Sequence, residues 1–244
     1  MMLSPCVSGI FLSLATLIIF SSCRSITVQD GAMNPRTIDK TVPEYKNPFP
    51  ANTYEHFVAS KEYPKTYGTY RDEPLLTSKV TKQKKKIVIC LKEQRGRYYI
   101  NDKVAIDFPV STGVRAHPTS TGSYQVIGKK VNHASNLYGK IYDAEGKCID
   151  YSANATDAIP EGGRFAGSKM PYWQRLTNDG LGLHVGKVRR TPQSHGCIRL
   201  QSATAKTLFA QTSIGTPVSI QQLPEGTAST KESPVAKPNK AKKL

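Results

Sequence analysis

Residues 194–200 read Ser-His-Gly-Cys-Ile-Arg-Leu and place the thiol of Cys197 directly after a His-Gly pair. A thiol attacks a carbonyl carbon as the thiolate, and an ordinary cysteine has a pKa near about 8.5, so a base or a positive dipole must assist it. Gly196 allows a tight turn that brings backbone N–H groups near the sulfur, where they can hold an oxyanion. His184 lies 13 residues upstream in the apolar stretch 181–185, and the returning chain can bring its imidazole beside Cys197.

The same stretch resembles the catalytic motif of the L,D-transpeptidase (YkuD) family, in which a histidine and a loop precede Ser/Thr-His-Gly-Cys. Four upstream segments are similar to further parts of the short-loop branch of this family, namely 110–113 (VSTG), 118–122 (PTSTG), 133–139 (HASNLYG) and 170–177 (MPYWQRLT). The resemblance covers about 84–222. It implies a mainly β domain with one or two helices, built as a β-sandwich or mixed sheet.

The resemblance also implies catalytic roles. Cys197 is the expected nucleophile and His184 the general base, with its ring oriented by the backbone carbonyl of Val185. Backbone N–H groups around Gly196 and Cys197 are expected to form the oxyanion hole, and His195 to shape the site.

Substrate contacts are expected from a second set of residues. Arg199 would hold a carboxylate of the substrate or brace the loop. The remaining contacts are expected from Ser194, His133, Tyr138 and Trp173, of which His133 and Trp173 could instead support the fold.

The implied reaction is a two-step acyl transfer on peptidoglycan stem peptides. Cys197 attacks the bond between the third residue of a tetrapeptide stem and its terminal D-Ala, and an amine from another stem or from a protein lysine resolves the thioester. Water as the acceptor would make the same site a carboxypeptidase. No metal or organic cofactor is needed.

Three other interpretations of the same residues stay open. Cys197 can be a buried structural thiol. His184, His195 and Cys197 are all residue types that bind zinc, although they lack the short paired spacings of zinc motifs. The domain can also be a catalytically inactive lipoprotein that binds wall polymer.

The chain is strongly basic, with 34 Lys and Arg against 18 Asp and Glu and a formal net charge of +16. Such a surplus favours an anionic partner, such as nucleic acid, anionic lipid or cell wall. The sequence has no zinc finger, RNA-binding signature or basic-region helix, so we expect no nucleic-acid partner. We expect a monomer that acts on the wall.

The N-terminus predicts export. Residues 9–20 form an apolar run of 12 residues, too short for a membrane span of about 20 and typical of a signal peptide. Ser21, Ser22 and Cys23 follow and resemble a lipobox, so we expect a signal peptide over 1–22 and lipidation of Cys23. Plain secretion and an uncleaved anchor are the alternatives. All three place the domain outside the cytoplasm, and we expect the periplasmic side of a bacterial membrane.

Five cysteines are present, and Cys90, Cys148 and Cys197 remain in the domain once the first two are assigned to the N-terminus. A Cys90–Cys148 disulfide is allowed in an oxidising compartment, and two free thiols are the alternative that we favour. Cys90 ends the run Ile-Val-Ile-Cys, which indicates a buried strand.

The rest of the chain divides by composition. Residues 24–83 have no sustained period and many prolines, which predicts an extended tether with a short helix near 54–60; a strap packed on the domain through its tyrosines is the alternative. The catalytic domain is expected over 84–222 and a disordered basic tail over 223–244. Within the domain we expect strands at 84–91, 122–128, 181–185 and 217–220, a hairpin at 97–106 turning at Asn101-Asp102, and a helix at 201–212.

Overall fold

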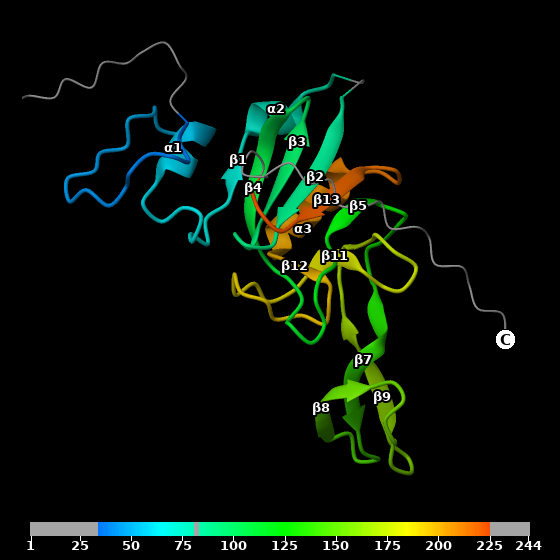
Figure 1. Cartoon of the computed structure of the whole chain (residues 1–244). Helices are drawn as coiled ribbons and strands as arrows, with labels where there is room; N and C mark the ends of the chain where they lie inside the picture. The colour runs from blue at the N-terminus through cyan, green and yellow to red at the C-terminus, as the bar shows by residue number, and fades with distance from the viewer. Residues whose placement is uncertain (1–33, 81–82, 225–244) are drawn as a thin grey trace, which may run out of the picture. The chain divides into compact units, whose positions relative to one another are not determined.

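The computed structural model describes residues 34–80 and 83–224 (Figure 1). The predicted signal peptide, Cys23 and nearly all of the basic tail lie outside the described residues. The fold is mainly β, as predicted, with a ten-stranded mixed sheet and a separate three-stranded sheet. No helix within the described ranges is both long enough and apolar enough to cross a membrane.

Three helices and 13 strands occur in the part of the chain that the structure describes. Their bounds are α1 Tyr54–Ala59, β1 Tyr70–Arg71, α2 Glu73–Thr77, β2 Lys85–Cys90, β3 Arg95–Ile100, β4 Lys103–Ser111, β5 Gly122–Gln125, β6 Gly128–Lys130, β7 Ala134–Tyr142, β8 Cys148–Asn154, β9 Arg164–Lys169, β10 Trp173–Arg175, β11 Gly182–Val185, β12 Ile198–Leu200, α3 Ser202–Gln211 and β13 Pro217–Gln221.

The large sheet curls on itself. Its order is β5-β13-β2-β3-β4-β12-β11-β10-β6, with β1 added beside β4, so β5 and β6 stand at opposite ends. Only Val126 and Ile127 join these two strands, and two residues span roughly 7 Å at most. The two edge strands therefore meet at this link, where the chain passes from one end of the sheet to the other.

The junction also corrects one prediction. The single strand expected over 122–128 is wrong, because the chain changes partners at its centre. Val126 is fully buried and donates its N–H to the carbonyl of Thr216 at 3.0 Å, on the β13 side. Ile127 donates to the carbonyl of Arg175 at 2.8 Å, on the β10 side.

The predicted hairpin is confirmed between β3 and β4. Asn101 and Asp102 have φ of 48° and 64°, the two left-handed residues of a type I′ turn, and Asn and Asp tolerate that conformation better than most residues do. Strand β4 then runs to Ser111, beyond the predicted end of the hairpin, and leads directly into the loop that lies against residues 194–196.

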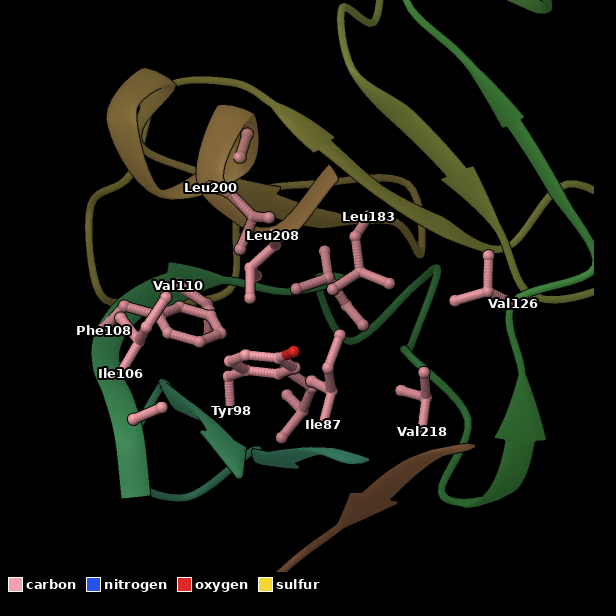
Figure 2. Packing of buried hydrophobic residues seen from close by; sticks show 14 of the residues in the cluster. Ile87, Tyr98, Ile106, Phe108, Val110, Val126, Leu183, Leu200, Leu208 and Val218 are labelled. Atoms are coloured by element: carbon pink, nitrogen blue, oxygen red, sulfur yellow. The ribbon is translucent and has the colours of Figure 1, made fainter. Parts of the chain in front are cut away.

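The core lies between α3 and the curled sheet. The predicted helix over 201–212 is confirmed as α3, and Figure 2 shows Leu208 from α3 and Leu200 from β12 pointing toward Tyr98 and Phe108 of β3 and β4. Each such buried side chain stabilises the fold by roughly 1.5–3 kcal/mol. Leu183 of β11 belongs to the same cluster, so the core fixes both strands that flank the candidate site.

The described part of the N-terminal segment packs on the sheet. The hydroxyl groups of Tyr54 and Tyr63 donate to the buried carboxylate of Asp107 at 2.9 and 3.1 Å, and burial raises the pKa of Tyr54 to about 12. Arg95 donates to the backbone carbonyls of residues 66 and 68. Residues 35–80 thus form a strap held by tyrosines and not an extended tether, because a buried carboxylate needs hydrogen-bonding partners. The helix expected near 54–60 is present as α1.

The three cysteines of the described residues are free. Cys90 is fully buried at the end of β2, as predicted, and Cys148 begins β8. The alternative of a Cys90–Cys148 disulfide is therefore not formed.

Candidate active site

A pocket of about 450 Å³ opens where the curled sheet meets the start of the small sheet. Its lining residues lie within the segments 118–124, 133–138, 168–187 and 194–199 and do not include Thr119 or Thr121. All nine catalytic and substrate-binding residues predicted from the sequence line this one pocket: His133, Tyr138, Trp173, His184, Ser194, His195, Gly196, Cys197 and Arg199.

Strands β11 and β12 bring the predicted base and nucleophile to one wall. The two strands pair in parallel, with Leu183 opposite Ile198 and His184 opposite Arg199. Cys197 immediately precedes Ile198, so its thiol and the imidazole of His184 enter the pocket from adjoining positions. The loop of residues 186–197 brings the chain back to lie beside β11, as the sequence spacing predicted.

The imidazole of His184 is held in one orientation. Its Nδ1 lies 2.8 Å from the backbone oxygen of Val185, the partner that the family resemblance implied. With the proton on Nδ1, the Nε2 atom is left as an acceptor. Burial lowers the pKa of His184 to about 4, against the opposing effect of the Val185 hydrogen bond. The ring is therefore neutral near pH 7 and can take up a proton.

The surroundings of Cys197 also favour the neutral thiol. Its Sγ donates to the backbone oxygen of Gly180 at 3.3 Å. Burial raises the pKa of Cys197, while the N–H of Gly182 and the charge of Arg199 oppose that rise. A raised thiol pKa beside a lowered imidazole pKa favours the neutral pair over a thiolate–imidazolium pair. The sulfur therefore needs a base to take its proton before or during attack, as the sequence analysis expected.

The loop of residues 194–197, here called the nucleophile loop, is held in shape by the hydroxyl group of Ser194. Gly196 has φ of +110°, a conformation that favours glycine. Its N–H donates to Oγ of Ser194 at 3.2 Å, and that hydroxyl donates to the backbone oxygen of Cys197 at 2.5 Å. Ser194 is 2% exposed, so its hydroxyl group braces the loop where the sequence predicted a substrate contact.

These bonds change the expected oxyanion hole. The Gly196 N–H is already engaged by Ser194 and is not directed at a substrate. The N–H of Cys197 has no hydrogen-bond partner among residues 34–80 and 83–224. Of the two backbone donors predicted from the sequence, Cys197 is the one that remains open.

Two groups of rings line the pocket. Trp173 is 3% exposed, and its ring centroid lies 5.0 Å from that of His133 and 5.8 Å from that of His184. On the other side, His195 stacks on Tyr138 of β7 with centroids 4.4 Å apart. The exposed His195 ring is thus a wall of the pocket, and Tyr138 reaches it from the small sheet.

The charge of the pocket is positive. Among its lining residues the cationic side chains are Lys169, Arg175, Lys187 and Arg199, and the one carboxylate is Asp179. The stem of Arg199 passes over Gly186, where a Cβ would come within 2.8 Å of Arg199 Cγ. Arg199 makes no salt bridge to any other described residue, so its charge is available to an anionic ligand.

Three contributors to the site were missed from the sequence. Gly180, in the loop before β11, and Gly182, the first residue of β11, contact the sulfur. Thr119 contacts the loop of Cys197 from a segment 77 residues away. The sequence showed Thr119 only as part of the Pro-Thr-Ser block, with no signal of its contact. A contact between two loops far apart in the chain leaves no local pattern in the sequence.

The part of the chain that the structure describes gathers no set of metal ligands. Across the described ranges, no group of three or more His, Cys, Asp or Glu side chains is placed to hold a metal ion, and this includes the His184, His195 and Cys197 set considered for zinc.

Comparison with known proteins agrees with the motif. The model of the L,D-transpeptidase catalytic domain (YkuD) matches residues 84–220, which is more than half of the chain. Similar solved structures include an L,D-transpeptidase from Mycobacterium smegmatis, with 20% identity, a TM-score of 0.44 and coverage of 57% of this chain and 59% of that chain. Others are an L,D-transpeptidase from Stackebrandtia nassauensis (22%, 0.42, 62% and 60%) and L,D-transpeptidase 1 from Mycobacterium tuberculosis (22%, 0.40, 57% and 62%).

The chain spans less than two thirds of the length of these neighbours. No curated protein matches it. The match of the family model over 84–220 shows that this chain belongs to the L,D-transpeptidase catalytic domain (YkuD) family.

Proposed function

We propose that this protein is a peptidoglycan L,D-transpeptidase in which Cys197 is the nucleophile and His184 the general base. The observation that carries the proposal is the 2.8 Å contact between His184 Nδ1 and the Val185 carbonyl. It directs the basic Nε2 atom away from the backbone on a strand that adjoins Cys197, in a pocket that both residues line.

The neutral resting pair defines the first step. As Sγ attacks the carbonyl carbon of the third stem residue, the thiol proton passes to Nε2 of His184. The C–N bond to D-Ala then breaks, its nitrogen takes the proton from His184, and a thioester remains on Cys197. Proton transfer and attack proceed together, because a free thiolate is disfavoured in this buried position.

The second step returns the enzyme to its starting state. An amine attacks the thioester carbon and gives a proton to Nε2 of His184. The C–S bond breaks, an amide forms, and the sulfur regains the proton from the imidazolium. Water in place of the amine gives a carboxylic acid, which is the carboxypeptidase alternative.

The positive pocket supports a substrate with free carboxylates. The terminal D-Ala of a stem carries one, and the unpaired Arg199 is the cation that we assign to a substrate carboxylate. Tyr138, Trp173 and His133 supply ring surfaces on either side of the pocket, and we propose that they contact the stem. Ser194 and His195 act in this proposal by shaping the loop and the wall.

The place of action follows from the same proposal. Family members act on wall peptidoglycan, and we propose that this chain works as a monomer on the periplasmic side of a bacterial membrane. A lipid on Cys23 would hold it there, with the folded strap 35–80 between the anchor and the catalytic domain.

The test uses the purified protein and disaccharide-tetrapeptides, with products followed by mass spectrometry. Cross-linked dimers and free D-Ala are expected from the wild type and from Cys148→Ala, a control thiol that does not line the pocket. Cys197→Ala should form neither. Release of D-Ala without dimers would favour the carboxypeptidase, and binding to wall fragments with no release from the wild type would favour the inactive binder. D-Ala release by Cys197→Ala would contradict the proposal.

A further inference from the structure

Thr119 lies directly behind the nucleophile loop and touches it through one hydroxyl group. The residue is 5% exposed. Its Oγ1 donates to the backbone oxygen of Gly196 at 2.5 Å and accepts the N–H of Gly113 at 2.8 Å. The hydroxyl group therefore acts as a donor to the nucleophile loop and as an acceptor from Gly113.

This contact fixes the orientation of the Cys197 N–H. The carbonyl of Gly196 and the N–H of Cys197 belong to one planar peptide unit and point in opposite directions. A hydroxyl group that holds the carbonyl oxygen on the Thr119 side therefore turns the N–H to the other side. Ser194 holds the next carbonyl, that of Cys197, in the same way. Two hydroxyl groups thus set the peptide planes on both sides of the nucleophile.

The backbone around Thr119 is itself closely packed on the loop. A Cβ at Gly113 would lie 2.7 Å from the Thr119 nitrogen and 2.9 Å from Cα of Gly196, so only a glycine fits between the two segments. Val114 donates to the carbonyl of Ser194 at 2.9 Å, and Ser194 donates to the carbonyl of Thr112 at 3.0 Å. Thr119 therefore acts from a fixed position.

We propose that Thr119 is a positioning residue for acyl transfer, which directs the Cys197 N–H at the oxygen that becomes negative when the sulfur attacks. The proposal rests on the proposed function, because it requires a tetrahedral intermediate at Cys197. A donor aimed at an oxyanion stabilises the transition state more than the bound substrate. Loss of the Thr119 hydroxyl group should therefore lower kcat and leave KM nearly unchanged.

The experiment compares three variants of the purified protein. Thr119→Val removes the hydroxyl group at nearly constant shape, Thr119→Ser keeps it, and Thr121→Val is the matched control from the exposed part of the same segment. Each is assayed for kcat and KM of D-Ala release from a disaccharide-tetrapeptide. Each is also assayed for alkylation of Cys197 by iodoacetamide, a displacement that breaks a C–I bond and forms no oxyanion.

We expect Thr119→Val to lower kcat about 10- to 100-fold, somewhat less than the loss of a whole oxyanion donor. KM and the alkylation rate should stay within about threefold of wild type, because neither depends on an oxyanion. Thr119→Ser should restore kcat to within about threefold, and Thr121→Val should match wild type. If Thr119→Val does not fold, Thr119→Ala makes the same comparison with a smaller side chain.

Two results would overturn the assignment of Thr119. One is a kcat for Thr119→Val within about twofold of wild type. The other is a parallel fall of kcat and alkylation rate, which indicates that the whole loop has moved. Failure of the proposed function itself looks different, since either the wild type would then release no D-Ala or Cys197→Ala would still release it, whatever stands at position 119.

Discussion

Replacement of Asp107 by Asn should cost this protein a large part of its stability. Asp107 is fully buried and accepts from Arg95 Nε at 2.5 Å, Arg97 Nε at 3.1 Å, and the hydroxyl groups of Tyr54 and Tyr63 at 2.9 and 3.1 Å. An Asn side chain has no charge, has one oxygen instead of two, and brings an NH₂ group among these donors.

The expected loss in the free energy of unfolding follows from the two buried arginine charges that lose their carboxylate partner. Arg97 keeps an ion pair with Glu93, whereas Arg95 keeps backbone carbonyls and the ring faces of Phe57 and Tyr63 but no carboxylate among the described residues. Breaking a buried ion pair from one side costs about 3–5 kcal/mol, because the remaining charge stays buried without its partner. That loss is about a fifth or more of the roughly 5–15 kcal/mol that holds an ordinary domain together.

Urea unfolding measures this loss against a matched control. Asp102→Asn also changes one carboxylate, but it removes only an exposed 3.7 Å ion pair with Lys86, at a turn position that accepts Asn. We expect the control to change the free energy of unfolding by less than about 1 kcal/mol. A change for Asp107→Asn no larger than that of the control would refute the view that the buried carboxylate holds the strap on the sheet.

Three further predictions concern the site. Because burial raises the pKa of Cys197, iodoacetamide should alkylate this thiol more slowly than free cysteine from about pH 6 to 8. The alkylation rate should climb as pH rises, and a plateau in this range would indicate a preformed thiolate. Turnover should stay level below neutrality and fall only as pH drops toward about 4, where His184 gains a proton; a fall centred near pH 6.5 would contradict the buried, neutral imidazole. Gly113→Ala should lose most of its D-Ala release, because the new Cβ would meet the His117 carbonyl oxygen at 2.0 Å and the Gly196 Cα at 2.9 Å, and wild-type activity would contradict this packing.

The residues that line the candidate site could be predicted from local sequence. A His-Gly-Cys turn and an upstream histidine carry their residue types in short stretches, and the pocket gathers Cys197 and His184 together. The hairpin at Asn101-Asp102 was predictable for the same reason, since a turn of two left-handed residues depends on those two residues alone.

The features that sequence reasoning missed, or left as an alternative, depend on partners far along the chain. Tyr54 and Tyr63 indicate a strap only when Asp107 is known to be buried beneath them, and a charged residue inside a strand gives no sign of burial. The break at Val126 arises because the two ends of a curled sheet meet there. The protonation state of Cys197 likewise depends on burial and on Gly180, neither of which is visible in the motif.

The central claim is that the sulfur of Cys197 carries the acyl group. Mass spectrometry of the intact protein, quenched in acid during turnover of a disaccharide-tetrapeptide, tests it most directly. We predict an adduct with the mass of the substrate less one D-Ala, on the proteolytic peptide that contains Cys197, and none on His184→Gln within the same time. Steady release of D-Ala with no adduct, or with an adduct on another residue, would contradict the claim.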